Sequence, residues 1–338
     1  MKILSGLTLK EFEDITDSLH ASKFRARQIH NWIYLKSASS IDEMTDLSVK
    51  FREELKQIAV VSDVKIKTKQ ASADGTLKYL IEYPDGECVE TVLMRFDNRA
   101  NLTACVSSQI GCAINCSFCA TGKLGFVRNL TYKEIVEQVL IIQRDIGLKV
   151  TNIVFMGQGE PLLNLDNVLK AMEIFSESFQ IGARRITVST SGIMPGIARL
   201  AELEMQSTLA ISLHAPNHEI RSALMGIEEK YNMTDLKKAL KDYISRAGRR
   251  VTIEYLLIKD INDSLDAAKQ LVDYIHDIKC NVNLIPYNPV NDIYEKPSNN
   301  AVMRFKSIVE QSGKKVTVRL ERGADIAAAC GQLQGQAV

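Results

Sequence analysis

The stretch LTACVSSQIGCAINCSFCA, residues 102–120, joins an apolar run to three crowded cysteines. Residues Leu102–Val106 predict a strand, and Cys112, Cys116 and Cys119 follow it with the spacing C-x3-C-x2-C. Thiolates this close together on one loop can bind a soft metal ion or an iron–sulfur cluster. The stretch therefore predicts a strand that leads directly into a metal-binding loop.

The spacing alone leaves two kinds of metal site open. A zinc site needs four ligands and usually shows paired C-x2-C spacing, and Cys105 is the thiol that could complete the set. A 4Fe–4S cluster held by three thiolates leaves one iron open, so that a substrate or cofactor can bind there. Chance burial of three cysteines within eight residues is the weakest reading.

From residue 102 onward, apolar strands alternate with helices. One helix begins after Thr131, where Thr131-Tyr132-Lys133-Glu134 forms a capping box, and it ends at Gly147. The predicted strands are Leu102–Val106, Asn152–Phe155, Ile186–Ser189, Ser207–Leu213, Val251–Ile258, Cys280–Ile285 and Val316–Leu320. Nearly continuous apolar strands are typical of a parallel sheet covered by helices on both faces. We expect an α/β fold, a partial (β/α)6-type barrel.

The first hundred residues follow a different pattern. Residues 8–60 look helical, whereas residues 64–94 predict a β-meander with turns at Asp74-Gly75 and Pro84-Asp85-Gly86. We therefore expect a small N-terminal α+β accessory domain over residues 1–97, and a barrel over residues 98–338 that includes the C-terminal segment.

Polar and glycine-rich motifs follow several of the predicted strands. Gly157-Gln158-Gly159-Glu160 follows the second strand, Ser189 ends the third, Ser212-Leu213-His214 ends the fourth, and Tyr287-Asn288-Pro289 follows the sixth. Ligands of parallel α/β folds bind at the carboxyl ends of the strands. This convergence with the cysteine loop predicts an active site at that edge.

The composition is that of a folded, soluble protein. The 338 residues include 46% hydrophobic and 25% charged side chains, and 42 basic against 41 acidic groups give a formal charge of +1. A globally basic coat for nucleic acid is therefore excluded, although a local basic patch is not. No apolar run approaches a membrane span, and no secretory signal precedes the fold. We expect a cytoplasmic protein whose seven cysteines stay reduced.

The cysteine spacing after a first barrel strand resembles the radical S-adenosylmethionine (radical SAM) superfamily. Further motifs are together similar to the RlmN/Cfr family of radical SAM methyltransferases, which act on an adenine of 23S ribosomal RNA. These motifs are Arg128-Asn129-Leu130, Gly159-Glu160-Pro161-Leu162-Leu163-Asn164, Ser189-Thr190-Ser191-Gly192, Ser212-Leu213-His214, Asn283-Leu284-Ile285-Pro286-Tyr287-Asn288-Pro289 and Ala328-Ala329-Cys330-Gly331-Gln332-Leu333. The resemblance covers nearly the whole chain and implies a radical SAM barrel.

The resemblance also implies the cofactors and the residues that bind them. Cys112, Cys116 and Cys119 would hold one 4Fe–4S cluster, and S-adenosylmethionine would be used twice per turnover. The implied contacts to S-adenosylmethionine are Gly159, Glu160, Ser189, Ser212, Leu213, His214 and Asn288. Cys330 would carry the transferred methyl group, Cys105 would resolve the intermediate through a transient disulfide, and Glu90 would accept a proton.

Within the family, the motifs around Glu160 and Pro286 favour methylation at adenine carbon-2, with carbon-8 methylation of the Cfr type as the alternative. The implied partners are 23S rRNA, a tRNA as a second substrate, and an electron donor such as flavodoxin or ferredoxin. A zinc-stabilised RNA-binding protein without catalysis is the alternative from another functional class.

Basic side chains that could bind RNA are scattered along the chain. Residues 21–40 carry lysines and arginines with interleaved aromatic rings and no acidic residue. Arg249-Arg250, Lys314-Lys315, Arg319 and Arg322 add further charge. Such patches can bind phosphates and stack bases, although each is more often a solvated face.

Overall fold

The computed structural model describes residues 1–96, 99–203, 206–290 and 292–335. Its central feature is a ten-stranded sheet with the order β14-β13-β12-β11-β10-β9-β6-β5-β4-β3. Seven neighbouring strands within the described residues run parallel. They are β6 (Arg99–Cys105), β9 (Asn152–Phe155), β10 (Ile186–Thr190), β11 (Thr208–Ser212), β12 (Val251–Leu257), β13 (Cys280–Pro286) and β14 (Val316–Val318). The expected partial α/β barrel is confirmed.

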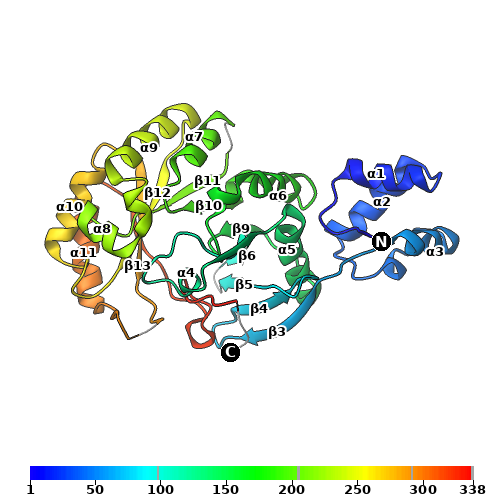
Figure 1. The fold of residues 1–338 in the computed structure, drawn as a ribbon, viewed down its shortest axis with the longest axis horizontal. Helices are drawn as coiled ribbons and strands as arrows, with labels where there is room; N and C mark the ends of the chain where they lie inside the picture. The colour runs from blue at the N-terminus through cyan, green and yellow to red at the C-terminus, as the bar shows by residue number, and fades with distance from the viewer. Residues whose placement is uncertain (97–98, 204–205, 291, 336–338) are drawn as a thin grey trace.

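Helices connect the parallel strands and cover the outside of the barrel (Figure 1). They are α5 (Tyr132–Ile146), α6 (Leu165–Glu177), α7 (Met194–Glu202), α8 (His218–Leu224), α9 (Met233–Ala247), α10 (Leu265–Ile275) and α11 (Asn299–Gln311). The predicted capping box at the start of α5 is present, and Gly147 ends this helix in the left-handed conformation with φ 64°. Local sequence therefore fixes where this helix begins and ends.

The predicted β-meander consists of β3 (Lys65–Ala71), β4 (Leu77–Glu82) and β5 (Cys88–Phe96). These strands are antiparallel, and β5 also pairs with β6, so that Val92 lies opposite Cys105. The meander thus continues the barrel sheet. Residues 97 and 98, where the sequence places the domain boundary, lie outside the described residues, and the division remains a prediction.

The N-terminal helices stand at one end of the molecule, away from the barrel strands (Figure 1). They are α1 (Leu9–Ser18), α2 (Lys23–Tyr34) and α3 (Val49–Ile58), and the short strands β1 (Lys2–Ile3) and β2 (Ala59–Val60) pair beside them. His30 Nε2 lies 2.9 Å from Ser178 Oγ, beyond the end of α6, which ties this unit to the barrel. None of the described helices combines the length and the apolar character that a membrane crossing requires.

Short elements complete the chain. The hairpin β7 (Gln109–Gly111) and β8 (Phe126–Asn129) encloses helix α4 (Ala120–Lys123) and the cysteine loop. Single 3₁₀ turns lie at Ile41–Glu43, Pro161–Asn164, Ala183–Arg185, Gly226–Glu229 and Ala324–Ile326. The C-terminal segment ends near the meander, where the Asp325 carboxylate accepts a hydrogen bond from the Ala73 amide at 3.1 Å.

Candidate active site

The three cysteines of the predicted metal loop line one cavity at the carboxyl ends of the barrel strands. The Cys112 amide donates to the Gly125 carbonyl at 2.8 Å, and the Cys119 amide donates to the Cys116 carbonyl at 3.1 Å. Gly111 precedes Cys112 with φ 69°, and a Cβ there would lie 1.8 Å from the Gly125 carbonyl oxygen. Only glycine therefore allows the two strands of the hairpin to approach this closely.

Burial sets the charge state of these thiols. It raises the pKa of Cys112 to about 12, and the neighbouring Glu160 and Cys119 add to this shift. Burial also raises the pKa of Cys116 well above its usual value, with Cys119 and Cys112 as the next contributors. Each thiol therefore needs a cationic partner to ionise, and a metal cluster is such a partner.

The zinc alternative requires Cys105 to join the same three cysteines. Cys105 instead lies on the wall of a second cavity with Cys330, which Cys119 also lines but Cys112 and Cys116 do not. Across the described ranges, no three histidine, cysteine or acidic side chains converge as ligands of a single metal ion. Three cysteine thiols that line one cavity are ligands of the kind that bind iron–sulfur clusters.

Most of the predicted S-adenosylmethionine contacts line the cavity of the cysteine loop. Gly159, Glu160, Ser189, Ser212 and His214 share it with the three thiols, and the cavity has an empty volume of about 940 Å³ including its open mouth. Two predicted contacts lie elsewhere: the Leu213 side chain is in the hydrophobic core, and Asn288 lines the second cavity.

Glu160 is held by its neighbours at the base of this cavity. One carboxylate oxygen accepts from the Leu162 amide at 3.0 Å, and the other accepts from the Ser191 amide and hydroxyl at 2.7 and 2.8 Å. Burial raises the pKa of Glu160, and these hydrogen bonds oppose that effect. Gly159, with φ 94°, lets the strand-end turn approach Gln109, because a Cβ there would lie 2.5 Å from the Gln109 side chain.

His214 presents a neutral imidazole to the same cavity. Its Nδ1 accepts a hydrogen bond from the Leu256 amide at 3.0 Å, which assigns the ring proton to Nε2. Burial lowers the pKa of His214 to about 3, and the charge of Arg221 adds to this effect. The ring is therefore an uncharged donor at neutral pH. Phe118 packs edge-on against it, with the ring centroids 5.2 Å apart.

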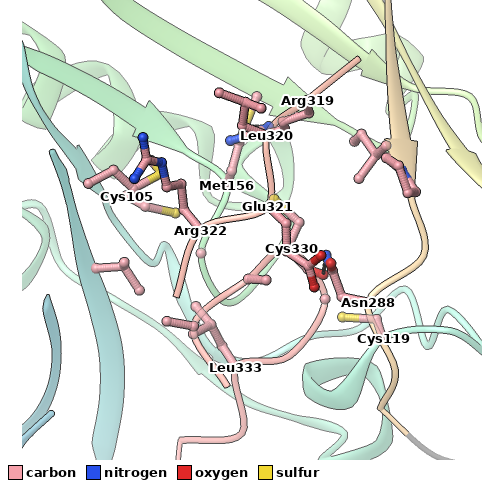
Figure 2. A pocket seen from close by; sticks show the side chains of 18 of the residues that line it. Cys105, Cys119, Met156, Asn288, Arg319, Leu320, Glu321, Arg322, Cys330 and Leu333 are labelled. Carbon is pink, nitrogen blue, oxygen red and sulfur yellow. Dashed lines mark hydrogen bonds between the residues drawn. The ribbon is translucent and has the colours of Figure 1, made fainter. Parts of the chain in front are cut away.

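A second cavity adjoins the first and brings Cys105 together with Cys330 (Figure 2). Cys105 is buried at the end of β6, whereas Cys330 is half-buried and lines both cavities. Burial raises the pKa of Cys105 to about 12, and Cys330 contributes to the shift. All seven cysteines are free thiols.

Contacts between the C-terminal segment and the cysteine loop place Cys330 in the site. The Ala120 amide donates to the Gly331 carbonyl at 2.8 Å, and the Thr121 hydroxyl donates to the Leu333 carbonyl at 2.7 Å. Asn288 Nδ2 donates to the carbonyl of Cys330 itself at 3.1 Å. Cys330 therefore stands between the cavity of the metal loop and the cavity of Cys105.

Two charged side chains that sequence reasoning missed also face the site. Arg319, which the sequence assigns to a surface charge patch, lines both cavities, and its Nη1 lies 3.2 Å from Met156 Sδ. The Cys330 side chain and Glu254 raise its pKa. Glu254 is buried in the wall of the first cavity, and its Oε2 has no hydrogen-bond partner. Arg319 directly follows β14, whereas Glu254 lies in the middle of β12, where a lone carboxylate within an apolar strand was the only signal.

Glu90 lies behind the C-terminal segment and not on the cavity walls formed by described residues. Its Oε1 is 2.9 Å from Lys78 Nζ, and its Oε2 accepts from the amides of Gln334 and Gly335. Lys78 is a further residue that sequence reasoning missed, and its only signal is a lysine within an apolar strand. The role of Glu90 as a proton acceptor remains a prediction.

Comparison with known proteins agrees with this arrangement. The family model "Radical SAM superfamily" matches residues 106–272, and "Ribosomal RNA large subunit methyltransferase N-terminal domain" matches residues 3–61. The dual-specificity RNA methyltransferase RlmN of Pseudomonas entomophila is 44% identical, over 98% of this chain and 90% of its own length. The probable RlmN of Thermoanaerobacter pseudethanolicus is 46% identical, over 98% and 97%.

A solved structure supports the same assignment. The crystal structure of a radical SAM methyltransferase from Sphaerobacter thermophilus superposes with a TM-score of 0.94 at 42% identity, covering 99% of this chain and 100% of that one. Relatives this similar over the full length share a family as well as a fold. The chain therefore belongs to the RlmN family of radical SAM RNA methyltransferases.

Proposed function

We propose that this protein methylates carbon-2 of an adenine in 23S rRNA, and of a tRNA adenine as a second substrate, through a methylcysteine at Cys330. The observation that supports this most directly is the place of Cys330 on the walls of both cavities. One cavity holds the three thiols of the metal loop and the other holds Cys105. A thiol between them can receive a methyl group on one side and be released by a second thiol on the other.

The residues present fit the implied cofactors. Cys112, Cys116 and Cys119 would hold a 4Fe–4S cluster, and the polar lining from Gly159 to His214 would hold S-adenosylmethionine. When bound, these groups supply a methyl group, a radical that removes a hydrogen atom, and an acceptor for one electron. The Glu160 carboxylate, anchored by Ser191, suits the ammonium of S-adenosylmethionine, and the Nε2–H of His214 suits an acceptor atom.

The protein's own residues carry the remaining steps. The Cys330 thiolate takes the methyl group, and after loss of a hydrogen atom its methylene carbon bonds to carbon-2 of adenine. Glu90 takes the proton from carbon-2. The Cys105 thiolate then attacks Cys330 Sγ: a sulfur–sulfur bond forms, the sulfur–carbon bond breaks, and the carbon takes the electron pair and a proton to become methyl. The resulting disulfide must be reduced before the next turnover.

The proposed chemistry implies a location in the cell and a set of partners. A cytoplasmic location would keep the transient disulfide reducible, and flavodoxin or ferredoxin would supply electrons. Residues 1–97 would contact RNA as an accessory domain, and residues 98–338 would hold the reaction. Phe24, 63% exposed on α2, is available for stacking, whereas Lys36 already covers the Trp32 ring at 3.6 Å. The target base must leave its stack to reach the cavities.

Nucleoside mass spectrometry tests the proposal. Anaerobically reconstituted protein, reductant and S-adenosylmethionine are incubated with a 23S rRNA fragment or with tRNA, and the RNA is digested. We expect 2-methyladenosine from wild-type protein and none from Cys330→Ala. A product that co-migrates with 8-methyladenosine would show that the protein methylates carbon-8 instead. Methylated RNA from Cys330→Ala would overturn the methylcysteine route.

A further inference from the structure

Lys78 and Glu90 form an ion pair buried on the inner side of the meander. Lys78 Nζ lies 2.9 Å from Glu90 Oε1, and the two side chains are 6% and 2% exposed. Lys78 faces Val92 across the β4–β5 ladder, and Glu90 faces Leu80, so the pair is diagonal on one face of the sheet. Burying two charges is costly, and their mutual contact is what makes it tolerable.

Both members of the pair also hold the C-terminal segment. Lys78 Nζ donates to the Ala327 carbonyl at 3.3 Å, three residues before Cys330. Glu90 Oε2 accepts from the Gln334 and Gly335 amides on the other side of Cys330. The pair therefore binds the C-terminal segment both before and after Cys330, the cysteine that is proposed to carry the methyl group.

The rest of Glu90 is equally constrained. Its amide donates to Gln158 Oε1 at 2.8 Å, and its carbonyl accepts from the Ser107 hydroxyl at 2.7 Å, so its backbone is fixed beside the glycine-rich turn. Only the carboxylate oxygen Oε2 is held by groups of the C-terminal segment. A substrate that displaces those two amides gains an acceptor oxygen on a carboxyl group whose other oxygen stays on Lys78.

We propose that Lys78 is a positioning residue that keeps the Glu90 carboxylate aimed at the Cys330 segment, and so sets the rate of proton removal from the adenine. This rests on the proposed function. In that step the carbon-2–hydrogen bond breaks, its electron pair stays in the ring, the proton passes to Glu90 Oε2, and one electron leaves to the acceptor that the cofactors supply. Lys78 touches neither adenine nor cofactor and acts through Glu90.

The test compares Lys78→Met, Glu90→Gln and their double variant, with Lys67→Met as the matched control. Lys67 forms a similar pair with Glu82 at 2.9 Å, but on the exposed edge of the same sheet. The substrate is RNA with hydrogen or deuterium at carbon-2 of the target adenine. The measurements are Cys330 methylation, 5′-deoxyadenosine formation, methylated RNA and the deuterium isotope effect on the last.

Lys78→Met should slow RNA methylation about 10–100-fold, the range for loss of catalytic positioning, and should raise the isotope effect. Cys330 methylation and 5′-deoxyadenosine formation should fall much less than RNA methylation, because Lys78→Met removes only one hydrogen bond to the Cys330 segment. Lys67→Met should leave all four unchanged. An unchanged isotope effect in Lys78→Met would overturn the inference, because a general loss of structure slows every step alike.

The double variant keeps the test decisive even where Lys78→Met folds poorly, since it removes both buried charges together. If Lys78 acts only through Glu90, Lys78→Met/Glu90→Gln should methylate RNA as slowly as Glu90→Gln alone. A further loss in the double variant would contradict the inference. Wild-type protein that yields no 2-methyladenosine would instead refute the proposed function, which separates the two failures.

Discussion

Cys105 and Cys330 face one cavity, although Cys105 ends the first parallel strand and Cys330 lies after the last. The register of β5 and β6 places Cys105 opposite Val92, whose side chain lines the same cavity. The two thiols differ in their surroundings: Cys105 is buried there, whereas Cys330 also reaches the cavity of the metal loop. This difference suits one thiol that acts before carbon–carbon bond formation and another that acts after it.

Removal of Cys105 should therefore trap the reaction at the RNA adduct. Cys105→Ala keeps the Cys330 thiol and the metal loop intact, but no aligned thiolate remains to attack Cys330 Sγ. We expect a covalent protein–RNA species that survives denaturation, visible on a gel with labelled RNA. Cys105→Ala/Cys330→Ala should form none, and an adduct in that double variant would show that the roles are wrongly assigned.

Removal of any one cysteine of the metal loop should abolish the cluster. Cys112→Ala, Cys116→Ala or Cys119→Ala leaves two half-buried cysteines, which cannot retain a 4Fe–4S cluster that already has one open iron. We expect loss of iron and of 5′-deoxyadenosine formation from S-adenosylmethionine. Cys88→Ala is the control, because Cys88 lies on β5 beside Lys67 and outside both cavities. Full iron content with retained cleavage in a loop variant would refute the assignment.

The local features of this fold could be read from the sequence, since each depends on neighbours along the chain. The Thr131 capping box and the left-handed Gly147 delimit α5 as expected. The predicted apolar runs are parallel strands in the structure. Glu160 and His214, which follow two of these strands, line one cavity with the cysteine loop, as expected for residues at the carboxyl ends of parallel strands. Sequence reasoning thus located the first cavity from periodicity and position.

The second cavity depends on tertiary contacts that no local pattern carries. Cys330 reaches it because Gly331 pairs with Ala120 and Leu333 pairs with Thr121. Arg319 belongs by sequence to a run of basic residues, yet it turns inward between Cys330 and Glu254. The direction of a side chain at a strand end is set by what packs over it, and here that is the C-terminal segment.

The neutral state of His214 should appear as a pH dependence of stability. Its pKa is about 3 in the folded chain and about 6.5 when exposed, so the unfolded chain binds the extra proton between these values. The free energy of unfolding should therefore fall with decreasing pH below about 6.5, by up to about 1.4 kcal/mol per pH unit from this group. His214→Asn, which tolerates the φ of 57°, should show a shallower fall in urea unfolding; equal slopes would count against a buried neutral ring.

Gly111 should be required for the metal loop, and Gly125 provides a matched control. Both have positive φ, 69° and 71°, so an alanine at either position costs about 1–2 kcal/mol of backbone strain. At Gly125 the new Cβ meets nothing within 4 Å, whereas at Gly111 it would lie 1.8 Å from the carbonyl that accepts from the Cys112 amide. Gly111→Ala must therefore displace Cys112 as well as strain the backbone. We expect Gly111→Ala to lose bound iron while Gly125→Ala keeps it, with iron measured per folded protein. Equal iron content in the two variants would mean that the hairpin adjusts without moving the cysteine.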